Sequence, residues 1–130
     1  MQLATIKKLM FTVILSIFST ITAADLKVVE WAPFVKNSPV TDQQLMAAAD
    51  RVNIEFLSQQ PGFIKRQLVK KNDTDYADIV YWANAEDAGN AAAKVQNCSV
   101  CGEYFKLMDI QGSATAGAGF AHYQVLVNWN

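Results

Sequence analysis

Strand-like patterns begin near residue 26 and recur in the middle of the chain. The segment Leu26–Val35 (LKVVEWAPFV) is rich in β-branched and aromatic residues, which favour a strand. Pro33 lacks a backbone N–H, so the end of this strand is expected at a sheet edge or a bulge. Two further strand-like runs, Phe63–Lys71 and Tyr76–Ala83, are separated by the turn sequence NDTD. We predict that these two runs form a β-hairpin.

Helical patterns fill the gaps between these strands. Thr41 is expected to cap a helix, with Gln44 completing a capping box. The apolar residues that follow at helical spacing are Leu45, Ala49, Val52 and Phe56. A second helix is predicted after Asn84, its N-cap, with Asp87 at the third helical position. Its inward-facing residues are Ala88, Ala92 and Val95, which are small enough to let the helix lie close to a sheet.

The last third of the chain ends in a strand-like run. Residues 101–110 (CGEYFKLMDI) form an apolar segment that can add one helical turn, and residues 111–119 (QGSATAGAG) predict a flexible connection. Residues 112–120 are also a candidate lid; they precede a strand rather than a helix, which excludes a phosphate-binding loop. The pattern of Phe120–Trp129 then predicts the fourth strand. The order β-α-β-β-α-β predicts an α+β, ferredoxin-like fold with both helices on one face of an antiparallel sheet.

One face of such a sheet would remain bare. Strands with one face in water should alternate apolar and polar residues, yet these strands carry apolar residues at both parities. The pairs are Val28 and Val29, Ile79 and Val80, and Leu126 and Val127. The pattern therefore predicts a homodimer in which a second copy covers the other face.

The first 24 residues have the features of a signal peptide. Lys7 and Lys8 supply positive charge, Leu9–Ile21 is an apolar run, and Thr22–Ala24 offers small residues before Asp25. The alternative is a membrane anchor, but the run is shorter than the roughly 20 residues that a spanning helix needs. We predict cleavage before Asp25, a domain over residues 25–130, and a secreted or periplasmic location.

Charge and hydropathy narrow the classes of partner. Asp25–Asn130 keeps nine of the eleven Lys and Arg residues and all twelve Asp and Glu residues, a net charge of −3. This mild acidity provides no electrostatic footprint for nucleic acid. No second apolar run is long enough to span a membrane, so no membrane association is expected after cleavage.

The two cysteines of the chain, Cys98 and Cys101, lie three residues apart. An oxidising compartment favours a local disulfide, and two buried thiols are a second structural reading. A redox motif is less favoured because Cys98 follows the alanine-rich helix, near its electronegative end. A metal site is also less favoured, since one histidine and two cysteines fall short of the four ligands that zinc takes, and no metal is expected.

The segment Pro61–Ala92 resembles the central signature of the antibiotic biosynthesis monooxygenase-like family of dimeric α/β barrels. The positions that carry the resemblance are Gly62, Phe63, Arg66, Trp82, Asn84, Glu86 and Ala88. The resemblance implies a homodimer with one pocket per subunit, between the helices and the sheet. It identifies a fold better than an activity, because one fold hosts many functions.

Members of this family include enzymes that oxidise phenols or quinols with O₂ and no cofactor, and others that degrade haem. The haem-degrading members resemble one another in an Asn on the first strand, a Trp ending the third strand and a His on the second helix. Only Trp82 matches this pattern. The resemblance therefore implies a protein without a bound cofactor, whose ligand is a small hydrophobic or aromatic molecule.

Trp82 and His122 are the candidate catalytic residues. Trp82 combines the family resemblance with a place at the end of a strand, where core packing is the alternative role. His122 is the only histidine and can transfer protons near neutral pH, although a lone histidine is more often an ordinary surface residue. The residues expected to line the pocket are Phe56, Phe63, Arg66 and Trp31.

Arg66 has two possible roles: it can orient an anionic substrate, or it can pair with Glu30 or Asp78. Glu30 and Trp31 are neighbours on one strand, so only one of them can face a given pocket.

Three hypotheses about function are consistent with the sequence. The first is an exported dimeric protein with monooxygenase-like activity on a small aromatic, quinol or polyketide-like compound. The second is a non-catalytic binding module of the same fold for an apolar ligand or a protein partner. The third is a thiol oxidoreductase acting through Cys98.

Overall fold

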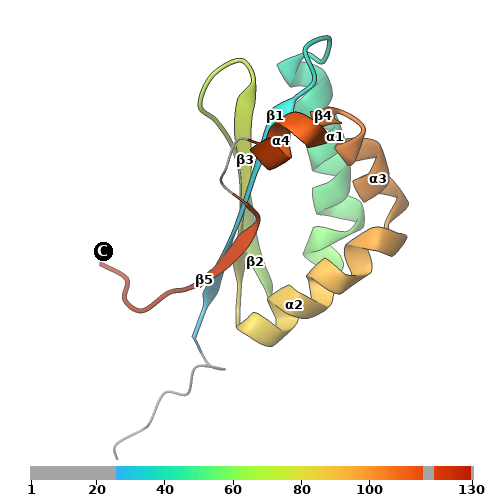
Figure 1. Ribbon diagram of the computed structural model, residues 1–130. Coiled ribbons are helices and arrows are strands. Elements are labelled where there is room, and N and C mark those ends of the chain that lie inside the picture. Colours follow the sequence, from blue (N-terminus) through green and yellow to red (C-terminus); the bar gives the residue numbers. More distant parts are fainter. Residues whose placement is uncertain (1–25, 116–118, 130) are drawn as a thin grey trace, which may run out of the picture.

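Five strands form one antiparallel sheet in the computed structural model, which describes residues 26–115 and 119–129 (Figure 1). The strands are β1 (Val28–Lys36), β2 (Phe63–Lys70), β3 (Asp75–Trp82), β4 (Met108–Asp109) and β5 (Ala121–Gln124). The sheet order is β2-β3-β1, and both β4 and β5 pair with β1 on its other side. The predicted hairpin is confirmed, with β2 and β3 paired antiparallel.

Helices lie on one face of this sheet, as the element order predicts (Figure 1). They are α1 (Asp42–Glu55), α2 (Ala85–Lys94) and α3 (Ser99–Phe105), joined by the 3₁₀ turns η2 (Leu57–Gln59) and η3 (Val95–Asn97). A fourth short helix, α4 (Ile110–Thr115), precedes β5. The protein therefore has an α+β, ferredoxin-like fold in which α3, β4 and α4 are added before the last strand.

The first helix begins where its sequence predicts. The Thr41 hydroxyl accepts the Gln44 backbone N–H at 3.2 Å, and the Gln44 side-chain oxygen accepts the Thr41 N–H at 2.9 Å. This reciprocal capping box satisfies donors that the first helical turn leaves unpaired. The predicted apolar stripe of α1 is buried against the sheet.

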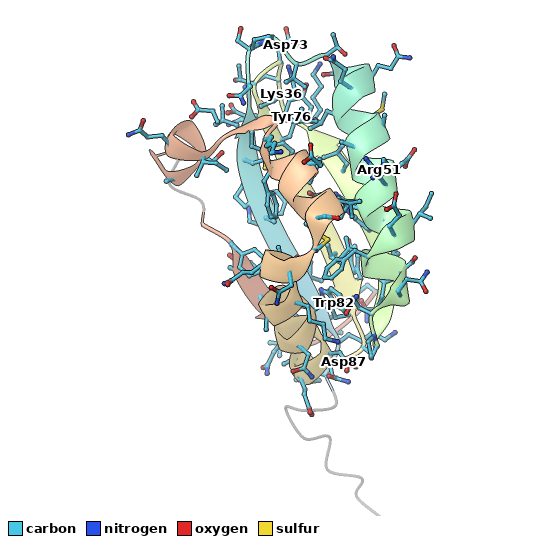
Figure 2. The ribbon with its side chains drawn as sticks, turned by 90° about the vertical axis from the view of Figure 1, so that its right-hand side faces the viewer. Lys36, Arg51, Asp73, Tyr76, Trp82 and Asp87 are labelled. Atoms are coloured by element: carbon cyan, nitrogen blue, oxygen red, sulfur yellow. A yellow bond between two sulfur atoms is a disulfide. The ribbon has the colours of Figure 1, made fainter. Side chains whose placement is uncertain are left out.

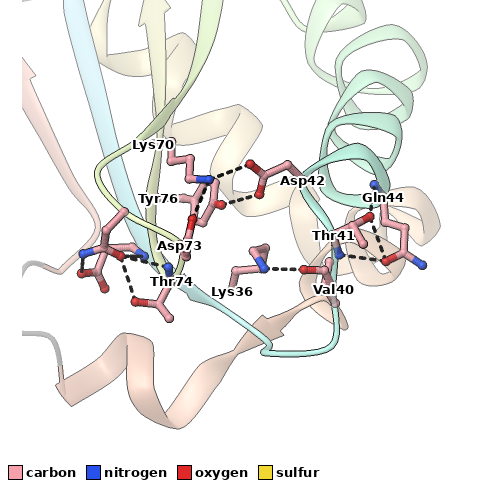
Figure 3. Close-up of polar contacts among 11 residues, drawn as sticks. Lys36, Val40, Thr41, Asp42, Gln44, Lys70, Asp73, Thr74 and Tyr76 are labelled. Atoms are coloured by element: carbon pink, nitrogen blue, oxygen red, sulfur yellow. Dashed lines mark hydrogen bonds and ion pairs between the residues drawn. The ribbon is translucent and has the colours of Figure 1, made fainter.

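A polar cluster fixes the start of α1 to the β2–β3 hairpin (Figure 3). The Lys70 ammonium lies 2.8 Å from Asp42 and 2.9 Å from Asp73. The Tyr76 hydroxyl donates to the other oxygen of Asp42, and the buried Lys36 donates to the Val40 carbonyl. The hydrogen bonds to Lys70 and Tyr76 lower the pKa of Asp42, which keeps this carboxylate charged.

The second helix lies close to the sheet because its buried side chains are small. Asn84 accepts the backbone N–H of Asp87 at 2.9 Å and so caps the helix as predicted. Ala88 and Ala91 are the buried residues of α2, whereas Ala92, predicted to face inward, is only partly buried. Trp82, at the end of β3, has no exposed surface.

The prediction of a flexible connection over residues 111–119 is wrong for its first part, which is helical in α4. Asp109 accepts the backbone N–H of Gly112 at 2.9 Å and, through its carbonyl, the Ser113 hydroxyl at 2.6 Å. Ser113 in turn accepts the Val35 N–H at 2.9 Å, which joins α4 to β1. These local bonds favour a short helix despite the Gly- and Ser-rich sequence. Residues 116–118 of the predicted lid lie outside the described residues.

The other face of the sheet is apolar and carries none of α1, α2 and α3 (Figure 1). Its central residues are partly buried and come from β1 and β3: Val29, Trp31, Pro33, Ile79 and Tyr81. Among residues 26–115 and 119–129, no helix has the length and hydropathy to cross a bilayer. The predicted signal peptide, residues 1–24, lies outside the described part of the chain.

Gly62 and Gly89 give a matched test of this fold. Gly62 has φ +76°, and a Cβ there would lie 2.2 Å from the Asp87 carboxylate. Because the backbone conformation and the contact both oppose a side chain, we expect Gly62→Ala to lower the free energy of unfolding by about 1–3 kcal/mol. Gly89 lies in α2 with open space beside it, so Gly89→Ala should raise that free energy by about 0.5–1 kcal/mol. Urea unfolding measures both changes, and equal effects at the two sites would contradict this local geometry.

Candidate functional site

A cavity of about 310 Å³ lies between the helices and the sheet. Its aromatic lining consists of Phe56, Trp82, Tyr104, Phe105 and Phe120, and its charged lining consists of Glu30, Arg66 and Asp78. The remaining lining is apolar and includes two alanines of α2, Ala91 and Ala92. A volume of this size with a few convergent polar groups is typical of a small-molecule site.

Small side chains create this space. Ala32 on β1 and Ala91 and Ala92 on α2 all line the cavity, and an alanine side chain ends at its Cβ. Interiors are otherwise close-packed, so a larger side chain at these positions would fill the volume. Figure 2 shows Trp82, which lines the cavity, towards one end of the sheet, and Lys36 and Tyr76 towards the other end.

A buried ion pair forms one wall of the cavity. Nε and Nη2 of Arg66 each lie 2.8 Å from Oδ1 of Asp78, and the two side chains are 6% and 11% exposed. Nη1 of Arg66 donates to the Ala49 carbonyl of α1 at 2.7 Å. The Tyr104 hydroxyl of α3 donates to Oδ2 of Asp78 at 3.0 Å. The network therefore joins β2, β3, α1 and α3.

The pKa values of Arg66 and Tyr104 are both raised, as this network of contacts predicts. Burial alone would lower the pKa of Arg66, but the charge of Asp78 and its hydrogen bond outweigh burial and raise it. Burial, followed by the charge of Asp78, raises the pKa of the Tyr104 phenol above its ordinary value. Arg66 therefore stays charged and Tyr104 stays protonated across the neutral range. Of the two roles expected for Arg66, the structure places it in an ion pair with Asp78.

Glu30 and His122 form a second polar pair at the cavity. Oε2 of the buried Glu30 lies 2.8 Å from Nε2 of His122, which sits directly opposite it in the β1–β5 register. Glu30 lines the cavity, whereas His122 does not and contacts the ring of Phe120 edge-on at 5.0 Å. His122 is therefore connected to the cavity through its contact with Glu30. A hydrogen-bonded carboxylate and imidazole can accept a proton and pass it towards solvent.

The sequence suggested Glu30 and Asp78 as partners of Arg66 and left open whether Glu30 or Trp31 faces the pocket. It did not identify Tyr104, Phe105 and Phe120 as cavity residues. The available signal was alternation along the last predicted strand, which places Phe120 and His122 on the same face. Tyr104 and Phe105 gave no such signal, because they belong to a segment predicted only as one more helical turn.

Two predicted pocket residues lie elsewhere. Trp31 points to the opposite face of the sheet, because it follows Glu30 and side chains alternate along a strand. Phe63 does not line the cavity; it packs edge-on against Trp82 with ring centroids 6.0 Å apart. Phe56, Arg66 and Trp82 do line it. Nε1 of the fully buried Trp82 has no hydrogen-bond partner among the described residues.

A disulfide joins Cys98 and Cys101, with an S–S distance of 2.12 Å. Cys101 is buried and lines the cavity, and Cys98 is partly buried. Cys98 follows the alanine-rich helix as expected, but it also starts a helix, which was not predicted from the sequence. Its sulfur accepts the Cys101 N–H at 3.2 Å and caps α3, because the chain turns at η3 and starts a new helix there. Among the described residues, no cluster of three or more His, Cys, Asp or Glu side chains is placed to hold a metal ion.

Comparison with known proteins identifies the fold. No family model matches the chain, and no curated protein matches its sequence. A variant of SnoaB, a cofactor-independent oxygenase from Streptomyces nogalater, superposes with a TM-score of 0.57 and 17% identity, over 82% of this chain and 97% of SnoaB. The protein shares the fold of this oxygenase.

Other solved structures are less similar. A conserved protein from Methanosarcina mazei has a TM-score of 0.52 and 12% identity, over 79% of this chain and 94% of its own. A haem-degrading protein from Mycobacterium tuberculosis has a TM-score of 0.48 and 19% identity, over 81% and 97% of the two chains. At these identities the likeness to SnoaB and to the Methanosarcina mazei protein shows the fold alone, and function must be argued from the cavity.

Replacing Arg66 and Lys70 by methionine separates the buried ion pair from an exposed one. Arg66→Met leaves the Asp78 carboxylate buried without its cation, so we expect the free energy of unfolding to fall by about 3–5 kcal/mol. Lys70 and Asp42 are 41% and 45% exposed, so water screens their interaction and Lys70→Met should change stability little. Chemical denaturation measures both, and a similar small loss for the two variants would show that the Arg66 pair does not hold the fold.

Proposed function

We propose that this protein is a monooxygenase-like enzyme that needs no bound cofactor and oxidises a small aromatic, quinol or polyketide-like compound in the cavity. The observation that carries the proposal is the cavity itself, where aromatic walls surround a buried carboxylate paired with a histidine. The fold shared with a cofactor-independent oxygenase supports it.

The proposed chemistry uses the substrate as the source of electrons. Glu30 accepts the proton of a phenolic hydroxyl, and His122 stabilises the carboxylate and relays the proton. The apolar walls exclude water and hold the electron-rich phenolate beside O₂. One oxygen atom becomes a ring carbonyl, and the other leaves as water with the hydroxyl proton and the displaced ring hydrogen, so a phenol and O₂ yield a quinone and water.

A non-catalytic binding module is the second candidate. His122 lies outside the cavity lining. Of the described lining residues, only Glu30 is an acid–base group that does not belong to the network of Arg66, Asp78 and Tyr104. Such a site can bind an aromatic molecule without reacting with it. The activity experiment below separates the two candidates.

We also propose that the active form is a homodimer. The apolar face of the sheet supports this, since Trp31 and Ile79 would be covered by a second copy. The residues after β5 add to the apolar surface: Leu126 and Trp129 are 81% and 86% exposed, and Figure 1 shows this end of the chain extending away from the helices.

Export is a further proposal, made from the sequence of residues 1–24. The disulfide between Cys98 and Cys101 supports it, because disulfides persist in oxidising compartments and are rare in reducing ones.

Cavity-filling substitutions test the proposed activity. Ala92 lines the cavity and Ala93 is exposed on the same helix. We expect the purified protein to consume O₂ with members of a panel of phenols and quinols, and Ala92→Phe to lower the rate at least about tenfold by occupying the substrate's space. Ala93→Phe serves as the control and should leave the rate unchanged.

Loss of activity in Glu30→Gln would support the proton-transfer step. Retained aromatic binding without any O₂ consumption by the unaltered protein would favour the binding module. Equal rates for the two phenylalanine variants would place the reaction outside this cavity.

Two isoleucine-to-lysine variants test the dimer. Ile79→Lys places a charge in the centre of the apolar sheet face, so we expect sedimentation velocity to show a shift from dimer to monomer. Ile54 is 66% exposed on α1, on the opposite side of the molecule from that face, and Ile54→Lys should remain dimeric. A monomeric unaltered protein at micromolar concentration would contradict the proposal.

A further inference from the structure

The cavity lining has more negatively charged side chains than positively charged ones. Among the described lining residues, Glu30 and Asp78 carry carboxylates and Arg66 carries the one cationic side chain. Lys65, the next cation along β2, lies on a separate hollow of the surface and contacts the ring of Tyr81. Carboxylates therefore outnumber cationic side chains on the lining itself, and His122 contacts Glu30 without lining the cavity.

The cation is already used within the protein. Nε, Nη1 and Nη2 of Arg66 donate to Asp78 and to the Ala49 carbonyl, and its guanidinium lies 5.3 Å from the centre of the Tyr104 ring. A ligand carboxylate could pair with Arg66 only by displacing Asp78, which would leave that buried carboxylate without its cation. Charge burial without a partner is strongly unfavourable, so this exchange is disfavoured.

Glu30, unlike Arg66, is placed to interact with a ligand, and it favours one that donates a hydrogen bond. Its Oε2 is bound to His122, and among the described residues no side chain or backbone group is hydrogen-bonded to its Oε1. A carboxylate accepts hydrogen bonds only, so it suits a ligand hydroxyl and repels a ligand carboxylate.

From these contacts we propose that the cavity selects uncharged aromatic alcohols, such as phenols and hydroquinones, and rejects their carboxylated analogues, with Glu30 as the residue that determines this specificity. The ligand's hydroxyl donates to Glu30 while its ring packs against the aromatic walls that include Phe56 and Trp82. The inference deepens the proposed function, because it takes the cavity to be the site at which an aromatic compound binds.

Binding of 2-naphthol and 2-naphthoate tests this selectivity with one ring system. At neutral pH the first ligand is uncharged and the second carries a carboxylate. We expect isothermal titration calorimetry to give a dissociation constant for 2-naphthol at least about tenfold below that for 2-naphthoate. In Glu30→Gln, binding of 2-naphthoate should tighten and the ratio should fall at least about fivefold, because the amide carries no charge. Glu86→Gln removes an exposed carboxylate of α2 that does not line the cavity and should leave the ratio unchanged.

Each outcome of this titration is informative. Equal or tighter binding of 2-naphthoate would overturn the selectivity while leaving aromatic binding intact. Failure of both ligands to bind would overturn it together with the aromatic site of the proposed function. The expected selectivity without any O₂ consumption would support this inference and count against the oxygenase.

Discussion

The buried contact between Arg66 and Asp78 is the interaction on which the rest of the structure depends. It joins the two strands of the hairpin, and through the Ala49 carbonyl and the Tyr104 hydroxyl it ties both α1 and α3 to the sheet. Removing two charges from water is costly, and a buried pair is stabilising only when further hydrogen bonds satisfy it. Here those bonds come from the helices, so the pair fixes where the helices sit.

That constraint explains both the cavity and its chemistry. The helices are held by polar contacts on one side and by the small side chains of α2 on the other, which leaves an apolar space that no side chain fills. Because the network occupies Arg66, the proposed acid–base chemistry is assigned to Glu30 and its partner His122. The disulfide adds a covalent link at the start of α3, next to the residues that position Tyr104.

Much of this architecture could be predicted from the sequence because its signals are local. The capping residues Thr41 and Asn84 mark the starts of α1 and α2, and the two strand-like runs around NDTD form the hairpin. The order of elements was then sufficient for the ferredoxin-like topology.

The predictions failed where the deciding contact is distant or unusual. Alternation separates Glu30 from Trp31 but does not reveal which of them faces the helices, and the partner of Glu30 is 92 residues away. The α4 segment looks like a loop by composition, yet Asp109 and Ser113 supply the bonds that make it helical. Cys98 ends one helical segment and caps the next, a double role that the preceding alanines obscure.

The most direct test of the central claim is a crystal structure of the protein with 2-naphthol bound. We expect the ring to lie against Trp82 and its hydroxyl to be hydrogen-bonded to Glu30, while Arg66 and Asp78 keep the contacts described above. A ligand oxygen bound to Arg66 with Asp78 displaced, or a ligand seated outside the cavity, would contradict that claim.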